Sequence, residues 1–270
     1  MKLENLLNGY LDLIVDSYEG LQEACREYDA AVKKLNKDVQ RATSKFHDAI
    51  NFFENALNCD PNNIEVLREI VQQSNFFGTV TSDAFEKIEN DIKVEQAFFK
   101  QIKLHQKVYK NAVAEISKYN KNTLFAHQDH IYQSLNLAGS VHKFSGEKLP
   151  IQQETWYDDS KKFKGRIKSL IKEIRDKQIA TRDEKGICKD PEYFSYLSKL
   201  RNNLESFNGY PEEDIFIPGI VDVYDELLIP YQKSRAENFQ TYNKVREESD
   251  LQQLVAELKG KKQEKENLEK

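Results

Sequence analysis

The chain has 270 residues, of which 39% are hydrophobic and 31% charged, and its formal net charge is −5. This composition favours a helical protein with much exposed surface, and it lacks the excess positive charge typical of proteins that bind nucleic acid. The three cysteines are scattered, which excludes a disulfide framework and a CxxC metal site. Nucleic acid is therefore an unlikely partner on charge alone.

The first sixty residues carry one apolar seam whose members are spaced alternately by four and three residues. An α-helix turns once per 3.6 residues, so a 3.5-residue repeat places these side chains along one nearly straight line. The pattern predicts a helix from about Leu3 to Leu57 that buries its seam against another long helix. The members of the seam are Leu7, Leu11, Ile14, Tyr18, Leu21, Cys25, Tyr28, Val32, Leu35, Val39, Ala42, Phe46, Ala49, Phe53 and Ala56.

A second long helix is expected after a turn and a shorter helix. The turn is CDPNN at residues 59–63, and the N-cap residues TSD at 81–83 predict that the second long helix begins near Phe85. The short connection favours antiparallel packing of the two long helices. We expect Leu35 to lie opposite Ile102 in this pairing.

The second half of the chain repeats the helical pattern less regularly. It predicts a helix that begins near Trp156 and ends before DEKGICKDP at residues 183–191, and another that begins at Pro191 behind the capping residue Asp190. A last long helix follows, which Pro230 kinks or shortens. No stretch combines β-branched residues with strict alternation, so essentially no sheet is expected.

These elements predict an all-α protein, an elongated bundle of long antiparallel helices with a coiled-coil-like hairpin. Residues 1–145 are expected to form the long helical hairpin region. Residues 151–258 are expected to form a second helical region that packs on the first or continues it. The charged tail, residues 259–270, has no apolar face and is expected to be disordered.

Residues 49–63, AINFFENALNCDPNN, resemble the second half of a tetratricopeptide repeat. The preceding half departs from the pattern of that family at Asn36 and Lys37, and no second copy follows one period later. Such repeats are stable only when several stack, so we interpret this segment as a long helix that meets a common turn sequence. The matching residues are Phe46, Ala49, Phe53, Ala56, Leu57, Asp60 and Pro61.

One basic amphipathic segment, residues 161–178, is the predicted interaction surface. A helix of this kind can lie on anionic lipid, bind phosphates or dock on an acidic partner. The alternative interpretation is a solvated face of a bundle helix whose apolar side is core. The basic face consists of Lys161, Lys164, Lys168, Lys172 and Arg175.

The remaining residues predict no catalytic, cofactor or metal site, and therefore no enzyme. His127 and His130 are one helical turn apart, but a zinc site needs at least a third protein ligand. Motifs for nucleotide phosphates, for a nucleophilic serine and for a zinc protease are missing from the sequence.

The sequence therefore favours a non-enzymatic helical scaffold or adaptor that binds a protein partner or associates with itself. One alternative is a protein of the membrane surface, which would resemble the crescent-shaped helical dimers that sense curvature and would use the basic face on an anionic membrane. Another is the mature helical domain of an exported or surface-anchored protein. The sequence lacks an apolar run of about 18 residues and a signal-peptide core, which predicts a soluble, cytoplasmic protein. An exported domain without its leader would look the same.

Overall fold

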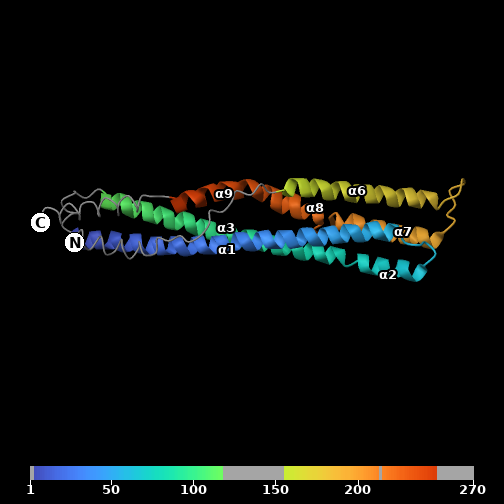
Figure 1. Ribbon diagram of the computed structural model, residues 1–270, viewed down its shortest axis with the longest axis horizontal. Coiled ribbons are helices and arrows are strands. Elements are labelled where there is room, and N and C mark those ends of the chain that lie inside the picture. The colour runs from blue at the N-terminus through green and yellow to red at the C-terminus, as the bar shows by residue number, and fades with distance from the viewer. Residues whose placement is uncertain (1–2, 118–154, 213–214, 248–270) are drawn as a thin grey trace, which may run out of the picture. The chain divides into compact units, whose positions relative to one another are not determined.

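The computed structural model describes residues 3–117, 155–212 and 215–247, and these are helical apart from the loops and one short hairpin (Figure 1). The all-α helical bundle is thereby confirmed. The helices of the first half are α1 (Leu3–Leu57), α2 (Ile64–Ser74) and α3 (Phe77–Ser117). Those of the second half are α6 (Trp156–Ala180), α7 (Pro191–Phe207), α8 (Ile220–Asp222), the π-helical η1 (Val223–Leu228) and α9 (Ile229–Glu247).

The hairpin joins α7 to α8. Its strands, β1 (Tyr210–Glu212) and β2 (Ile215–Ile217), pair antiparallel. Gly209 precedes it with φ +92°, and a Cβ on this residue would lie 3.0 Å from the backbone nitrogen of Gly219. The chain can therefore close the base of the hairpin so tightly only because both positions are glycine.

Two compact units make up the structure, and each draws on separate stretches of the chain. Unit 1 contains the described residues of 3–32, 94–117 and 236–247. Unit 2 contains those of 33–93 and 155–235. Helices α1, α3 and α9 each contribute to both units.

The two regions predicted from the sequence, 1–145 and 151–258, therefore each contribute to both units. The expected boundary between these regions, and the charged tail at 259–270, lie outside the described residues. The sequence contains no signal inside α1 or α3 that marks where one unit ends, because both helices continue without a break across that point.

The apolar seam of α1 is confirmed, since every member whose side chain is described, from Ile14 to Ala56, is buried. Beside the seam runs a second buried line that contains Ser17, Ala24 and Ala31. A two-stranded coiled coil buries only the narrow seam, whereas a wider buried face requires more than one neighbouring helix. In unit 1 these neighbours are α3 and α9, whose side chains share one core cluster with α1.

Helices α1 and α3 run antiparallel within each unit. In unit 2, Lys87 on α3 forms an ion pair of 3.0 Å with Asp38 on α1. Asp91, four residues after Lys87, pairs with Lys34, four residues before Asp38. In unit 1, the ring of Tyr28 on α1 lies 5.6 Å from that of Phe99 on α3, and Gly20, earlier on α1, lies against His105, later on α3. The predicted direction of packing is therefore correct.

The expected register of this pairing is wrong. Leu35 lies in the core of unit 2, one residue from the Lys34–Asp91 pair, whereas Ile102 lies in the core of unit 1 together with Leu21. A heptad pattern looks the same after every shift of seven residues, so periodicity alone cannot choose between registers.

Helix α3 begins at Phe77, eight residues before the predicted start. The predicted cap residue Thr81 lies inside the helix, where its hydroxyl donates to the carbonyl of Gly78 at 2.8 Å. A serine or threonine inside a helix can satisfy its hydroxyl on the preceding turn, so the residue type does not distinguish a cap from this position.

The start of α7 agrees with the sequence, whereas Pro230 does not shorten α9 as expected, since the helix begins before it at Ile229. The side chain of Asp190 accepts a hydrogen bond from the N–H of Tyr193 at 2.9 Å, with Pro191 as the first helical residue. The interruption at Pro230 takes the form of the π-helical turn before it, where the N–H of Ile229 donates to the carbonyl of Tyr224 five residues earlier. The wider turn accommodates a residue that has no N–H and whose ring crowds the preceding turn.

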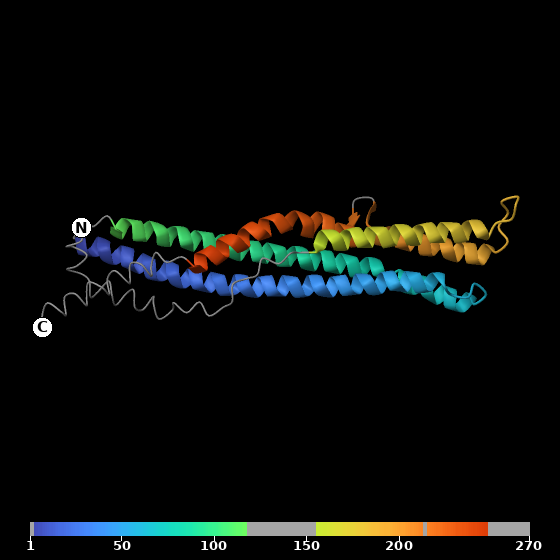
Figure 2. The ribbon, with the colours of Figure 1, turned by 45° about the horizontal axis from the view of Figure 1, so that its top comes forward.

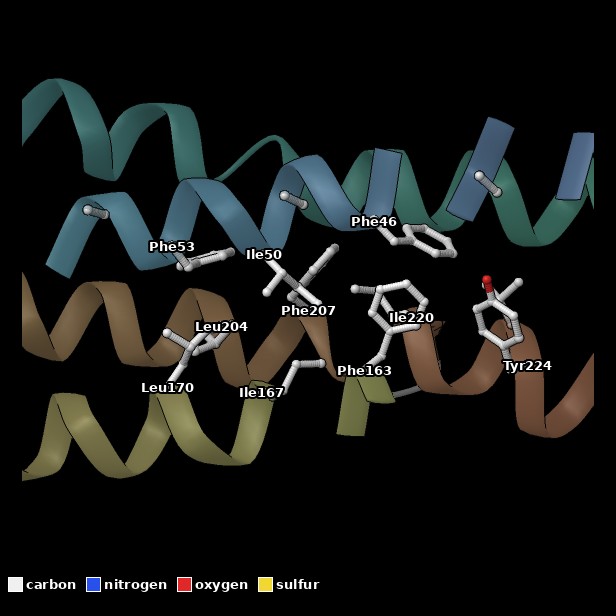
Figure 3. Packing of buried hydrophobic residues seen from close by; sticks show 14 of the residues in the cluster. Phe46, Ile50, Phe53, Phe163, Ile167, Leu170, Leu204, Phe207, Ile220 and Tyr224 are labelled. Carbon is white, nitrogen blue, oxygen red and sulfur yellow. The ribbon is translucent and has the colours of Figure 1, made fainter. Parts of the chain in front are cut away.

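Aromatic and aliphatic side chains from α1, α6, α7, α8 and η1 meet in the core of unit 2 (Figure 3). The ring of Phe46 on α1 lies 6.1 Å from Phe163 on α6, 6.5 Å from Phe207 on α7 and 6.3 Å from Tyr224 on η1. Each such aromatic pair adds about 0.5–1.5 kcal/mol beyond the area that it buries. This core fixes which face of α6 points inward, and therefore which face is left outside.

Candidate functional site

The predicted basic face lies on α6, on the side away from the core. Phe163, Ile167, Leu170 and Ile174 are buried on the inner side of this helix. Residues three, four and seven apart share one face of a helix, so the basic residues at the intervening positions are directed outward. The amphipathic interpretation of this segment therefore agrees with the burial of its apolar side chains.

Lys164 is the one member of the basic face that is half-buried. Its ammonium donates to one carboxylate oxygen of Asp225 on η1, and the hydroxyl of Ser160 donates to the other at 2.7 Å. Asp225 therefore joins α6 to η1 through two side chains of α6. The role of Lys164 in the folded protein is to hold this contact.

Arg175 is exposed, and its guanidinium lies 3.6 Å from the carboxylate of Glu205 on α7. Glu205 is at the same distance from Arg201 one turn earlier on α7. An exposed ion pair at this distance contributes little to stability, so the pair leaves Arg175 accessible to a partner.

Lys161, Lys168 and Lys172 are exposed, and none of them forms a salt bridge with a described residue. Two apolar side chains continue this line at its ends, Tyr157 with 62% of its surface exposed and Ile179 with 69%. At 100° per residue all five side chains fall within one narrow sector of the helix. We call these five residues the α6 stripe.

A separate set of contacts attaches α6 to α1. Arg166 lies off the stripe, and its guanidinium donates to Glu54 at 2.7 Å and to Asn51 at 2.8 Å. His47 is 3.3 Å from the same guanidinium and packs its ring against Phe163. The stripe is therefore displayed on a helix that is fixed on its inner side.

A buried ionic cluster in unit 2, which the sequence analysis did not single out, joins α1 to α3. Asp38 and Asp91 are both buried, while their partners Lys87 and Lys34 reach the surface. Burial raises the pKa of Asp91, and the neighbouring Asp38 carboxylate adds to this rise, whereas Lys34 opposes it. Burial acts in the same direction on Asp38, but hydrogen bonds from Lys87 and Asp91 outweigh it and hold the pKa of Asp38 below its ordinary value.

This cluster is a structural contact and does not form a metal site. Among the residues that the structure describes, no group of three or more His, Cys, Asp and Glu side chains is placed to hold a metal ion. The predicted pair His127 and His130 lies outside these residues. The signal that could have revealed the cluster is the presence of Asp38 and Asp91 among apolar residues on the inner faces of two long helices.

An open groove between α2 and α7 is the second feature that sequence reasoning missed. It encloses about 440 Å³. Its apolar lining residues are Ile64, Leu67 and Val71 on α2 with Pro191 and Tyr196 on α7, and its polar lining residues are Arg68, Gln72, Glu192, Ser195 and Lys199. The only sequence signal for it was the spacing of Ile64, Leu67 and Val71, which place one apolar face on a short helix.

The two helices that form the groove run parallel, since both proceed in the same direction from their N-terminal loops (Figure 2). Near their C-terminal ends the side-chain amide of Asn203 donates to Asn75 at 2.9 Å and also contacts Ser74. The hydroxyl of Tyr196 donates to the carbonyl of Ala56 at 2.8 Å, which holds this ring in the floor of the groove.

Comparison with known proteins adds no further assignment. No family model matches the sequence, and neither the curated proteins nor the solved structures gave a match. Within the described ranges, every helix is too short or too polar to cross a membrane. The geometry of the described residues is therefore the basis for the function proposed below.

Proposed function

We propose that this chain is a non-enzymatic helical scaffold that binds an acidic protein partner through the α6 stripe. The observation that carries the proposal is the exposure of Lys161, Lys168 and Lys172 on one face, without a salt bridge to any described residue. Most other cations near this face, such as Lys164 and Arg166, are bound to side chains of the same chain.

The spacing of the stripe fits recognition of an extended acidic surface. At a rise of 1.5 Å per residue, Lys161 and Lys172 are separated by about 16 Å along the helix. Because α6 is already held by Asp225 and Glu54, its cations are presented without the cost of ordering the backbone on binding. Charges in such an arrangement chiefly raise the rate of encounter and the specificity for an oppositely charged partner.

A second candidate is an anionic membrane surface, and the exposed Tyr157 and Ile179 at the ends of the stripe favour it. Helices that lie in the membrane interface combine lysines with apolar side chains that enter the headgroup region. Two such side chains bury less apolar area than a full amphipathic face, so we rank this candidate below a protein partner. For the scaffold with an acidic protein partner we also propose a cytoplasmic location.

Charge reversal tests the proposal directly. The variant Lys161→Glu/Lys168→Glu/Lys172→Glu is compared with Lys37→Glu/Lys45→Glu/Lys100→Glu, which changes exposed lysines elsewhere and gives the same net charge. Crosslinking with mass spectrometry in the native cell identifies the proteins that contact α6. Each is then titrated as purified protein against wild type and both variants, at low and high salt.

We expect the stripe variant to fold normally, because exposed charges contribute little to stability, and to lose the partner that the control variant retains. Binding of the wild type should weaken as salt rises, since screening shortens to about 8 Å at physiological ionic strength. Co-sedimentation with phosphatidylserine vesicles tests the second candidate with the same variants. If both variants retain every partner and bind vesicles equally, the stripe is only a solvated face and the proposal is wrong.

A further inference from the structure

The groove between α2 and α7 has properties that the proposed function of α6 does not require. Its floor is formed by Leu67 and Tyr196, which are buried, and by the half-buried Val71. A volume of about 440 Å³ lies within the range of about 300–1,000 Å³ found for ligand sites. The groove is therefore large enough to take several apolar side chains from a partner.

The shape of the groove selects an elongated occupant. Since Asn203 on α7 contacts Ser74 and Asn75 on α2, residues of the two parallel helices that are 128–129 positions apart in the chain lie at about the same level. The lining residues extend from Ile64 to Gln72 on one wall and from Pro191 to Lys199 on the other. Eight residues of helix correspond to about 12 Å, which equals a little more than two helical turns of an occupant.

Charges on the walls define the chemistry of the occupant. Arg68 projects from α2 and Lys199 from α7; both are exposed, and neither forms a salt bridge with a described residue. By the contacts of Asn203, Lys199 lies two to three residues beyond the level of Arg68, which is about 3–4 Å along the helix. The one acidic lining residue, Glu192, lies at the opposite end, beside Ile64.

We infer that this groove is a docking site for an acidic amphipathic helix of another protein. The occupant carries apolar residues at helical spacing (i, i+3 or i+4, and i+7), which contact Leu67, Val71 and Tyr196. It also carries two acidic residues within one turn of each other, which face Arg68 and Lys199. Apolar anchors on one face of a helix that lies in a groove are a recurring mode of peptide recognition, and the two cations add selectivity for acidic sequences.

A peptide library tests both the site and the stated chemistry. The full-length protein is used to select phage-displayed helical peptides of about 12 residues, long enough to cover the groove. A selected peptide is synthesised with a fluorescent label, and its affinity is measured by fluorescence polarisation. The matched variants are Ile64→Arg, which blocks a lining residue, and Val66→Arg, which changes a residue of the same 38% exposure on α2 outside the lining.

We expect the selected peptides to combine the apolar spacing with acidic residues, and to lose binding to Ile64→Arg but not to Val66→Arg. The variant Arg68→Glu/Lys199→Glu should bind them about tenfold more weakly, since two lost ion pairs account for up to about 25-fold together and reversal adds repulsion. When this variant is used as the target for peptide selection, the selected peptides should carry lysine and arginine in place of the acidic residues.

Four results would overturn the inference. Peptides that depend on Ile64 but show no acidic preference would disprove the stated chemistry. Peptides that bind Ile64→Arg as well as wild type, or no enrichment at all, would show that the groove is not a docking site. A dimer in sedimentation that Ile64→Arg abolishes would assign the groove to a second copy of this chain. None of these results bears on the α6 stripe, whose variants leave the groove unchanged.

Discussion

The packing of unit 1 predicts an unusual effect on stability when Gly20, which lies inside α1, is replaced by alanine. Replacing glycine by alanine within a helix normally stabilises it, because alanine restricts the unfolded chain and is the best helix former. At Gly20, however, a Cβ would lie 2.7 Å from Nδ1 of His105 on α3 and closer still to the neighbouring ring carbon. Gly165 in α6 is the matched control, since a Cβ there would meet no atom within 4 Å.

The two terms in the free energy of unfolding have opposite signs at Gly20. The gain in helix propensity is about 0.5–1 kcal/mol at either glycine. Ordinary non-bonded contacts lie at about 3.5–4 Å, so the ring of His105 must move by roughly 1 Å to admit the new methyl group. Overpacking in a rigid core costs about 1–3 kcal/mol, and the half-buried ring of His105 places this site at the lower end of that range. We therefore expect Gly165→Ala to stabilise the protein and Gly20→Ala to give no net increase in stability, because the cost of moving His105 offsets the gain in helix propensity.

Thermal unfolding followed by circular dichroism measures both effects, because 1 kcal/mol shifts the Tm of a chain of this size by about 2–4 °C. The variant His105→Ala supplies the background in which the clash is removed. In that background Gly20→Ala should raise the Tm, as Gly165→Ala does in the wild type. Equal increases for Gly20→Ala and Gly165→Ala in the wild-type protein would refute the reasoning, because His105 would then not lie against Gly20.

Leu21→Asp and Leu35→Asp should each reduce the free energy of unfolding by several kcal/mol, because each places an unpaired charge in a buried seam; an unchanged Tm for both would show that the seam is exposed. Asp91→Asn and Asp38→Asn should change the pH dependence of stability in opposite directions, as measured by urea unfolding between low and neutral pH. The pKa of Asp91 is raised, so the stability linked to its protonated form is present below its ordinary value of 3.8 and is lost as the pH rises through the raised value. The variant Asp91→Asn cannot ionise at this position, so its free energy of unfolding should rise relative to that of the wild type as the pH increases. The pKa of Asp38 is lowered, so its contribution is present above 3.8 and is lost as the pH falls through the lowered value. Asp38→Asn should therefore be most destabilised at neutral pH, and parallel pH profiles for the two variants would contradict this assignment.

The sequence by itself determined most of the local structure. The spacing of the seam located α1 from Leu3 to Leu57, and Asp190 followed by Pro191 located the start of α7. These features depend on residues close in the chain, on helical periodicity and on caps that bond within one turn. For the same reason the basic face of α6 was predictable, since an amphipathic helix buries its apolar side whatever its neighbour.

The tertiary structure alone decided how these elements combine. A repeating pattern does not fix register, so the sequence could not show that Asp38 meets Lys87 or that Leu35 and Ile102 belong to different cores. It could not show that Lys164 is held by Asp225, because that contact joins residues 61 positions apart. The groove between α2 and α7 likewise exists only because two helices distant in sequence lie parallel and leave apolar side chains between them. Periodicity records which face of a helix avoids water, whereas the identity of the neighbour that covers it depends on long-range packing.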